Sequence, residues 1–314
     1  MTDDAIKKAI PDMEFNKPLK DYTTFRIGGP AKYFIEVKEV SRFVEIMTFV
    51  REHKLRFFIL AGGSNVLFLE EGFPGLVIKN STGEIKRQGN NLIVDSGYDL
   101  HGVVRYACKE GLAGLEKLAW IPGSIGGSVY GNAGAYGSSI GDLVRSVEVF
   151  DLQDGQLKEF SASHCEFSYR NSAFKSRNYV ILRVILEFKQ GDTDVMFSKC
   201  EDINQERKAK NPQLPSAGCF FKNIPIADVK NNKEVQGYLE GLPGDKIPAG
   251  LLIDKLGLKG KTIGGAMISK KHANFIVNNG NATADNVLKL ADLVKTKVRD
   301  TFGIQMELEV LIVG

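Results

Sequence analysis

GLEKLAWIPGSIGGSVYGNAGAYG, at residues 114–137, carries the most weight for the fold of this chain. Its glycines belong to two of four glycine patches, which occupy residues 26–30, 61–65, 122–127 and 131–137. Because glycine has no Cβ, a glycine loop after a strand lets backbone N–H groups come close to a pyrophosphate. A tight turn is the alternative for any single patch, but four patches in one half of the chain favour a pyrophosphate-binding protein.

Two standard nucleotide-binding motifs are missing from the sequence. No GxGxxG fingerprint follows an expected strand, and the Walker pattern GxxxxGK[ST] does not occur. The glycine patches therefore predict neither a standard Rossmann site nor a P-loop, but another design for binding a pyrophosphate.

Apolar periodicity and capping residues predict a chain of mixed helices and strands. Expected strands cover 32–37, 57–60, 76–79, 92–95, 179–188 and 305–314, with a hairpin turn at Asp154–Gly155. Expected helices begin at Ser41, Asp99, Asp194 and Thr283. The helix after Asp99 is expected to end at Gly111, the one after Asp194 at Asn211-Pro212, and the one after Thr283 at Gly303.

Composition narrows the class of protein. The net charge of +3 and the pI of about 8.5 are too mild for a nucleic-acid binder. The cysteines Cys108, Cys165, Cys200 and Cys219 form no CxxC pair, so we expect neither a metal site nor a disulfide framework. No stretch reaches the ~20 apolar residues of a membrane span, and the first residues lack a signal-peptide core. We therefore expect a cytoplasmic globular protein without membrane insertion.

Seven motifs, in order, carry a resemblance to a known family. They are TTFRIGGPA (23–31), AGGSNVL (61–67), the stretch 114–137, SYRNSAF (168–174), PSAGCFFKN (215–223), SKKHANFIVNNGNATADNVL (269–288) and LEVLIVG (308–314). Together they resemble the UDP-N-acetylenolpyruvoylglucosamine reductase family, whose flavin domain is of the vanillyl-alcohol oxidase type.

The resemblance implies an α+β fold. A two-subdomain FAD-binding module of the vanillyl-alcohol oxidase type, at 1–79 and 80–210, precedes a smaller α+β substrate-binding domain at 211–314. The terminal strand is expected to pack back on the flavin module. A monomer is favoured.

The resemblance also implies NADPH-dependent, FAD-mediated reduction of UDP-N-acetylglucosamine enolpyruvate to UDP-N-acetylmuramate, a peptidoglycan precursor. The partners are thus small molecules. Since the loop 61–65 offers no histidine or cysteine, we expect noncovalent FAD. The expected cofactor-binding residues are Arg26, Gly28, Gly29, Ala61, Gly62, Gly63, Ser64, Asn65, Pro122, Gly123, Ser124, Gly126, Gly127, Asn132, Gly134 and Ala135.

By the same resemblance, three residues are catalytic. Arg170 would face the substrate carboxylate, Cys219 would donate a proton in place of the family's serine, and Glu309 would assist the enolate. Without the motifs, Arg170 reads as a surface salt-bridge residue and Cys219 as an inert packed cysteine. Glu309 reads as a solvent-facing strand residue, with Glu307 two positions earlier as its competitor.

Five residues match substrate-binding positions of the family: Lys210, Lys222, Asn223, His272 and Asn274. The lysines could neutralise a diphosphate as compact charges. The alternatives are an ordinary exposed lysine at a helix end for Lys210 and a structural role for His272.

The chain departs from the family pattern in two places. The 49-residue spacing between Arg170 and Cys219 leaves no room for the tyrosine-bearing loop of one branch, so no tyrosine is expected as a lid. Residues 224–246 interrupt the usual FKNP motif, and we expect a polar, mobile surface loop there.

Two other functions stay open from the sequence. A hydroxyacid or sugar oxidase could use the same flavin fold, because fold does not fix chemistry. A flavin- or nucleotide-binding regulatory protein without turnover is the second alternative.

Overall fold

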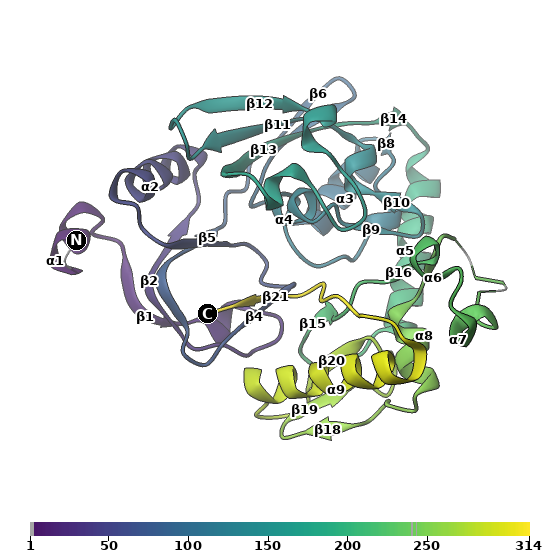
Figure 1. Cartoon of the computed structure of the whole chain (residues 1–314). Coiled ribbons are helices and arrows are strands. Elements are labelled where there is room, and N and C mark those ends of the chain that lie inside the picture. The colour runs from purple at the N-terminus through teal and green to yellow at the C-terminus, as the bar shows by residue number, and fades with distance from the viewer. Residues whose placement is uncertain (1–2, 240, 243) are drawn as a thin grey trace. The chain divides into compact units, whose positions relative to one another are not determined.

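The computed structural model describes residues 3–239, 241–242 and 244–314 (Figure 1). Contacts within the chain group it into two compact units, and neither unit is continuous in sequence. The first unit comprises Met1–Lys17, Ala31–Gly62 and Pro74–Arg207, and the second comprises Pro18–Pro30, Gly63–Phe73 and Lys208–Gly314. The predicted domains 1–79, 80–210 and 211–314 concern cofactor and substrate binding, and that division stays a prediction.

The larger sheet of the first unit has the strand order β12-β11-β13-β7-β6. Its strands are β6 (Ile85–Gln88), β7 (Asn91–Asp95), β11 (Val144–Asp151), β12 (Leu157–Ser161) and β13 (Tyr179–Glu187). Val184 in the central strand stands opposite Val94 on one side and Val147 on the other. All three are buried, because β-branched side chains pack well on a pleated surface. The expected hairpin is confirmed, with Gly155 at φ +78° in the turn.

Helix α3 (Leu100–Lys109) begins and ends as the sequence predicts. The Asp99 carboxylate accepts a hydrogen bond from the Gly102 N–H at 2.8 Å, which satisfies one of the N–H groups that a helix start leaves open. Beyond the helix, Gly111 has φ +67°, the left-handed conformation that glycine adopts at this position. The buried face of α3 joins the core under the five-stranded sheet.

Two predicted helix starts are wrong by one or two residues. Helix α2 (Val40–His53) follows Glu39 without a side-chain cap, so Ser41 lies inside its first turn. Helix α5 (Thr193–Lys210) follows Asp192, whose carboxylate accepts from the Val195 N–H at 2.9 Å. Since Asp192, Thr193 and Asp194 are all good caps, the sequence pattern could not select among them.

A second sheet in the first unit has the order β1-β2-β5-β3. Its strands are β1 (Glu14–Pro18), β2 (Pro30–Val37), β3 (Phe57–Leu60) and β5 (Phe73–Asn80). Strands β3 and β5 are parallel, with Ile59 opposite Ile78. The buried face of α2, with Phe43 and Met47, shares a core with this sheet. Helix α2 connects β2 to β3 along the chain and covers the sheet with its buried face.

Short elements complete the first unit. They are α1 (Asp3–Ala9), β8 (Leu112–Ala113), η2 (Glu116–Leu118), α4 (Ile125–Tyr130), β9 (Gly134–Ala135), β10 (Ser138–Ser139), η3 (Ile140–Asp142), η4 (Ala162–Cys165), η5 (Ala173–Lys175) and β14 (Lys189–Gln190).

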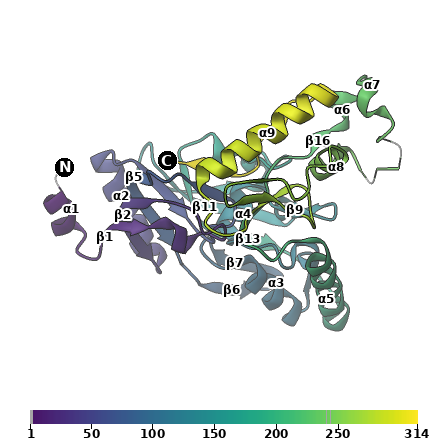
Figure 2. The same ribbon diagram turned by 90° about the horizontal axis from the view of Figure 1, so that it is seen from below.

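The second unit is built on a sheet of order β15-β20-β19-β18 with helix α9 across it (Figures 1 and 2). The elements are β15 (Ser216–Cys219), β18 (Thr262–Ile263), β19 (Ala266–Ile268), β20 (Phe275–Asn278) and α9 (Ala284–Phe302). Thr283 forms a capping box with Asn286, and Gly303 ends the helix at φ +65°, so both predicted ends of α9 are confirmed.

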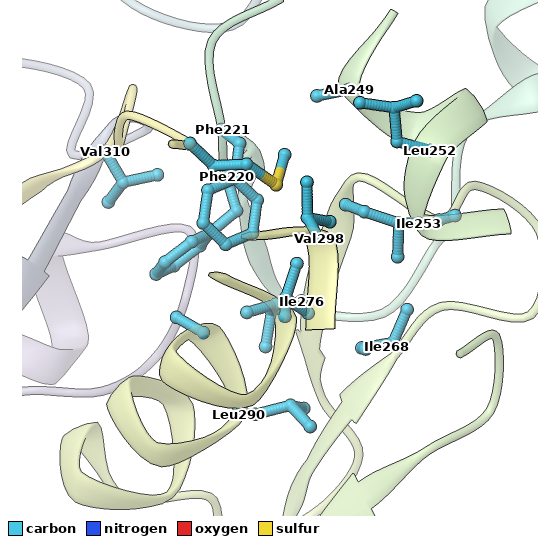
Figure 3. Packing of buried hydrophobic residues seen from close by; sticks show 14 of the residues in the cluster. Phe220, Phe221, Ala249, Leu252, Ile253, Ile268, Ile276, Leu290, Val298 and Val310 are labelled. Atoms are coloured by element: carbon cyan, nitrogen blue, oxygen red, sulfur yellow. The ribbon is translucent and has the colours of Figure 1, made fainter. Parts of the chain in front are cut away.

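The core of this unit gathers side chains from several elements. Figure 3 shows Phe220, Phe221, Ile276 and Val298 converging between the strands and α9. Leu252 and Ile253 of helix α8 (Ala249–Lys255) close the other side of the same core. Each of these six side chains is at most 1% exposed, so the segment around Cys219 is attached to a well-packed support.

The chain ends on β21 (Leu311–Val313), which pairs in parallel with β4 (Val66–Phe68). The predicted strand over 305–314 is therefore too long. Residues 307–309 pair instead with residues 220–222 through the bridge between Phe221 and Leu308. A regular strand begins only after the chain leaves that partner and reaches β4.

The predicted surface loop at 224–246 is largely wrong. The segment forms β16 (Ile224–Pro225), α6 (Ile226–Val229), α7 (Lys233–Gln236) and the start of β17 (Lys246–Ile247). The same unit also contains the 3-10 turn η1 (Leu19–Tyr22), earlier in the chain. Val229 and Val235 are buried in the core of the unit. These two valines, six residues apart in polar sequence, supply too little periodicity to predict helices. Glu240 and Pro243 lie outside the described residues.

We predict that Gly63→Ala destabilises the protein far more than Gly89→Ala. Both glycines are left-handed, at φ +60° and +61°, so the conformational cost of alanine is about 1–2 kcal/mol at each. A Cβ at Gly63 would lie 2.1 Å from the Tyr22 carbonyl oxygen, whereas a Cβ at Gly89 meets nothing within 4 Å. Urea unfolding of both variants checks this, and equal shifts of the midpoint would contradict it.

Candidate active site

The glycine loops of the first unit approach each other backbone to backbone. A Cβ on Gly62 would lie 2.9 Å from the Gly123 Cα, so a side chain at Gly62 would push the two loops apart. The backbone of Ala61 is held in place by Lys79, whose ammonium donates to the Ala61 carbonyl oxygen at 2.8 Å. Gly62 and Pro122 are exposed. The loops therefore present bare backbone to solvent, which is the surface that a phosphate-bearing cofactor needs.

The loop 122–127 is anchored through its amides to the turn between β7 and α3. The Ile125 and Gly126 N–H groups donate to the carbonyl oxygens of Tyr98 and Ser96 at 2.9 and 2.7 Å. The Gly127 N–H donates to the Ser124 hydroxyl at 3.1 Å. A Cβ on Gly126 would lie 2.7 Å from the Ser96 Cβ. Gly126 thus has a packing reason to be glycine, and its predicted cofactor contact stays a prediction, as do those of Gly127 and Ser124.

Asn132 braces the next glycine patch. Its side chain is buried, donates to the Ser168 carbonyl oxygen at 2.9 Å and accepts from the Gly141 N–H at 3.1 Å. It therefore ties the patch 131–137 to the turn that carries Arg170. Gly134 and Ala135 form β9 beside it.

Arg170 lies in a tight turn. Ser168 and Asn171 exchange two backbone hydrogen bonds of 3.1 Å, and Arg170 between them has φ +53°. Its guanidinium donates to the Gly134 carbonyl oxygen at 3.2 Å. A left-handed conformation is uncommon for a long side chain and persists where surrounding contacts hold it. The structure thus directs the predicted catalytic cation Arg170 to a glycine patch, and its catalytic role stays a prediction.

In the second unit, Cys219 ends β15 and stands opposite Phe275 of β20. Asn274 fixes the residues that follow it. The Asn274 side chain is 2% exposed, accepts from the Phe221 N–H at 3.0 Å and donates to the Phe221 carbonyl oxygen at 2.8 Å. The Phe220 N–H donates to the Asn274 carbonyl oxygen at 2.7 Å. Since both ends of its amide are engaged, Asn274 supports the Cys219 segment, and its predicted contact with a substrate stays untested.

Glu309 lies on the strand segment beside Cys219. Its N–H donates to the Phe220 carbonyl oxygen at 2.9 Å, and its own carbonyl oxygen accepts from the Asn65 side chain at 3.2 Å. Glu309 is half-buried, whereas Glu307 is exposed and forms an ion pair of 2.9 Å with Lys222. Hydrogen bonding to Lys222 lowers the pKa of Glu307. The two glutamates that the sequence could not rank therefore differ in exposure, and Glu307 forms an ion pair with a lysine.

The remaining predicted substrate residues lie in the second unit. The Asn223 side-chain oxygen accepts from the Ala249 N–H at 3.1 Å and so supports the start of α8. Lys210 is the exposed last residue of α5. The structure brings Cys219, Lys222, Asn223 and Glu309 onto two paired segments, while Lys210 stands apart from that pairing in sequence.

His272 is held in one orientation. Its Nδ1 accepts from the Asn274 N–H at 3.2 Å, which leaves the proton of the neutral ring on Nε2. The ring packs edge-on against Phe275, with centroids 4.9 Å apart. Burial lowers the pKa of His272, with smaller contributions from the cations Lys259 and Lys210. The ring is thus a neutral group at neutral pH.

The predicted contacts at Arg26, Gly28, Gly29, Gly63, Ser64 and Asn65 fall in the second unit. Close packing explains the glycines there: a Cβ on Gly29 would lie 2.0 Å from the Glu70 carbonyl oxygen, and one on Gly28 would lie 2.8 Å from the Phe68 Cβ. Their cofactor contacts stay predictions.

Lys79 is the residue that sequence reasoning missed. It follows the apolar run of β5, is half-buried, and burial lowers its pKa. The sequence signal for this role is a lysine at the carboxyl end of an apolar strand, a position from which it can support a nearby glycine loop.

Other features carry no site. An open groove of about 490 Å³ lies on one face of the five-stranded sheet, where Arg183 pairs with Asp95 and Glu148, and it contains no predicted site residue. Across the described part of the chain, no cluster of three or more metal-ligating side chains occurs. Among those same residues, every helix is too short or too polar to cross a membrane.

Comparison with known proteins gives the class. The family model of the FAD binding domain matches residues 31–161, and that of the UDP-N-acetylenolpyruvoylglucosamine reductase C-terminal domain matches residues 209–313. The glycine loops of the first unit, at 61–62, 122–127 and 131–137, lie within the first match. The chain is therefore a flavin-dependent oxidoreductase with FAD as its cofactor, and the predicted two-part α+β fold is confirmed.

Full-length relatives narrow this further. The UDP-N-acetylenolpyruvoylglucosamine reductase of Caldanaerobacter subterraneus subsp. tengcongensis is 35% identical over 99% of this chain and 97% of its own length. That of Caldicellulosiruptor bescii is 38% identical over 96% and 91%. The crystal structure of the Thermus caldophilus enzyme aligns with a TM-score of 0.76 at 33% identity, covering 96% and 98%. The chain belongs to the UDP-N-acetylenolpyruvoylglucosamine reductase family.

We predict that Asn274→Ala lowers the free energy of unfolding by about 3 kcal/mol, because it leaves the buried N–H and carbonyl groups of Phe221 without partners, at roughly 1–3 kcal/mol each. Asn90→Ala is the matched control, since its side chain is exposed and bonds only to the exposed Gln190 amide in the described contacts. Urea unfolding monitored by circular dichroism measures both. If Asn274→Ala lowers the free energy of unfolding no more than Asn90→Ala does, the hydrogen bonds between Asn274 and Phe221 do not stabilise the fold as proposed.

We predict that stability falls as the pH is lowered from 7 to 5, in part through His272. Its folded pKa is lowered below the ordinary value of about 6.5, so the unfolded chain binds a proton first as the pH falls through 6.5. His272→Gln should make the loss of stability over this range smaller. His101, whose pKa burial also lowers, acts in the same direction and remains in this variant. An unchanged slope in His272→Gln would contradict the assignment.

Proposed function

We propose that the chain catalyses NADPH-dependent reduction of UDP-N-acetylglucosamine enolpyruvate to UDP-N-acetylmuramate, in peptidoglycan precursor synthesis. The observation that carries the proposal is the pairing of the segment containing Cys219 with the segment containing Glu309, which places a thiol acid and a half-buried carboxylate on adjacent backbone. The names and coverage of the relatives support the choice of substrate.

The bare backbone at Gly62, which lies too close to Gly123 for a side chain to be added, fits a loop that receives a dinucleotide cofactor. The first unit would hold noncovalent FAD through residues 61–62, 122–127 and 132–135, and Arg26, Gly28, Gly29 and 63–65 remain further predicted contacts. When bound, FAD supplies the transfer of a hydride equivalent from NADPH to the β-carbon of the enolpyruvyl ether.

The protein must then manage the negative charge that develops beside the substrate carboxylate. A fixed cation stabilises such charge most when it is held before the reaction begins. Arg170 meets this requirement, since its turn and its hydrogen bond to Gly134 fix the guanidinium. We assign it to the carboxylate of the enolpyruvyl group.

Reduction is completed by a proton delivered to the α-carbon. The Cys219 thiol donates that proton, and solvent returns one to the thiolate. The Glu309 carboxylate polarises the enolate-like species from the paired segment. The overall change is one hydride from NADPH and one proton from water added across the double bond, giving the lactyl ether.

The substrate diphosphate is assigned to Lys222 and Lys210, with Asn223 and His272 beside them. Lys222 pairs with Glu307 at 2.9 Å, so a diphosphate must compete with this carboxylate for the ammonium. Glu307 therefore moderates substrate affinity while Glu309 serves the reaction. Because the chain is a flavin-dependent oxidoreductase, we set aside the alternative of a regulatory protein without turnover. The alternative of an oxidase is decided by the reoxidation experiment that follows.

We predict that NADPH bleaches the flavin of the purified protein under anaerobic conditions and that adding UDP-N-acetylglucosamine enolpyruvate restores the oxidised spectrum. The lactyl ether should form in equal amount, measured by mass spectrometry. A flavin that stays reduced until air is admitted would favour the oxidase reading and reject the proposed substrate.

We predict that Cys219→Ala leaves flavin reduction by NADPH unchanged but slows reoxidation by the enolpyruvyl substrate at least 100-fold, within the usual range for loss of a general acid. Cys219→Ser should keep measurable turnover, because a hydroxyl can also donate. Stopped-flow spectroscopy separates the two half-reactions. Normal reoxidation in the alanine variant would remove Cys219 from the mechanism.

We predict different outcomes for the two neighbouring glutamates. Glu309→Gln should slow substrate-driven reoxidation by 10-fold or more with little change in KM. Glu307→Gln should lower KM for the substrate, because Lys222 loses its carboxylate partner. Steady-state kinetics at fixed ionic strength compares them, and identical effects on kcat would mean that the assignment of Glu309 is unsupported.

A further inference from the structure

Trp120 is the single tryptophan of the chain and has an unusual backbone conformation. Its φ is +62°, a left-handed value that is an outlier for a bulky residue. The side chain is nevertheless 41% exposed, so burial of the indole does not repay this strain. A strained residue that the surrounding structure retains is a pointer to function.

His101, in the first turn of α3, supports the indole. The two rings lie against each other at a tilt, with centroids 4.1 Å apart and an angle of 32° between their planes. The His101 Nδ1 is buried and, within the described part of the chain, has no hydrogen-bond partner. Burial lowers the pKa of His101, which keeps the ring neutral. His101 thus contributes a ring face, and together the two side chains form the Trp120–His101 pair.

This pair is built onto the loop that we assign to the cofactor pyrophosphate. The Leu100 N–H, next to His101, donates to the Gly123 carbonyl oxygen at 2.9 Å, and the Ile125 N–H donates to the Tyr98 carbonyl oxygen at 2.9 Å. Trp120 is three residues before Gly123, so at most about 10 Å of extended chain separates their α-carbons. A base joined to that pyrophosphate through a ribose is therefore within reach of the indole.

We propose that the Trp120–His101 pair is the stacking platform for the adenine of FAD. The inference rests on the proposed placement of FAD in the first unit. Every nucleobase has a π-face that stacks on an aromatic side chain. Adenine is assigned rather than the flavin ring because the flavin ring must exchange hydride with two partners through its face, whereas adenine takes no part in the reaction. The FAD binding domain match, at 31–161, contains both side chains.

The test uses the full-length protein after its FAD is removed, with circular dichroism to verify that each variant is folded. Trp120→Ala should weaken binding of both FAD and ADP by about tenfold or more, as loss of one base–aromatic stack predicts. It should leave binding of FMN, which has the flavin ring but no adenine, within about twofold. Trp120→Phe, which keeps a ring, should retain most of the affinity. Calorimetry gives the dissociation constants.

Phe197→Ala is the matched control. Phe197 of α5 has the same 41% exposure as Trp120 but is not part of the assigned cofactor site, so its loss should leave all three dissociation constants unchanged. In addition, ADP should quench the emission of the single tryptophan in the wild-type protein, because stacking brings the base against the indole.

The outcomes separate this inference from the proposed function. If the wild-type protein binds no FAD, the cofactor site itself is rejected. If FAD binds and turnover is normal but Trp120→Ala binds ADP as well as the wild type does, the platform alone is rejected. If Trp120→Ala weakens FMN as much as ADP, the ring at this position is not adenine, and the assignment is overturned in favour of the flavin ring.

Discussion

The buried hydrogen bonds between Asn274 and Phe221 are the constraint on which the second unit depends. Once the sheet and α9 remove this region from water, the N–H and carbonyl groups of Phe221 must be satisfied, and a single amide at 2% exposure satisfies both. The same segment then pairs on its other side with residues 307–309. Cys219 and Glu309 therefore owe their proximity to backbone pairing and core packing, and their positions follow before any ligand is considered.

In the first unit the corresponding constraint is space. Gly62 and Gly123 allow two loops to touch through their backbones, and Asn132 ties the third loop to the turn of Arg170. The positive φ of Arg170 and Trp120 shows that the loops hold side chains in conformations that short-range preferences oppose. Such pre-set geometry is what electrostatic stabilisation and base stacking require.

Most of the fold could be predicted from the sequence, because its main elements are signalled locally. The hairpin at Gly155, the caps Asp99 and Thr283, and the apolar runs of β3 and β13 were all found where expected. The motifs identified the family, which the comparisons confirm. Failures occurred where distant partners decide. Residues 307–309 look like strand but pair with 220–222 first, and Val229 and Val235 bury themselves in a segment that looks polar.

The residues of the candidate site could be predicted from the sequence, but the contacts that give each of them a different role could not. Nothing in the sequence separates Glu307 from Glu309, since the exposure of each and the ion pair of Glu307 with Lys222 depend on tertiary contacts. The sequence also gave no sign that the Asn274 amide is fully engaged by Phe221. Contacts of this kind join residues more than fifty positions apart, and a single sequence carries no direct signal of them.

The parallel pairing of β21 with β4 has a consequence for biosynthesis. Leu311 pairs with Val66, so the strand at 66–68 emerges from the ribosome long before its partner has been translated. Contacts of such long sequence separation form slowly, since loop-closure entropy must be overcome first. The second unit can be completed only after residues 311–313 have been translated. During that interval β4 is an unpaired apolar strand, the kind of segment that chaperones bind and that aggregation exploits.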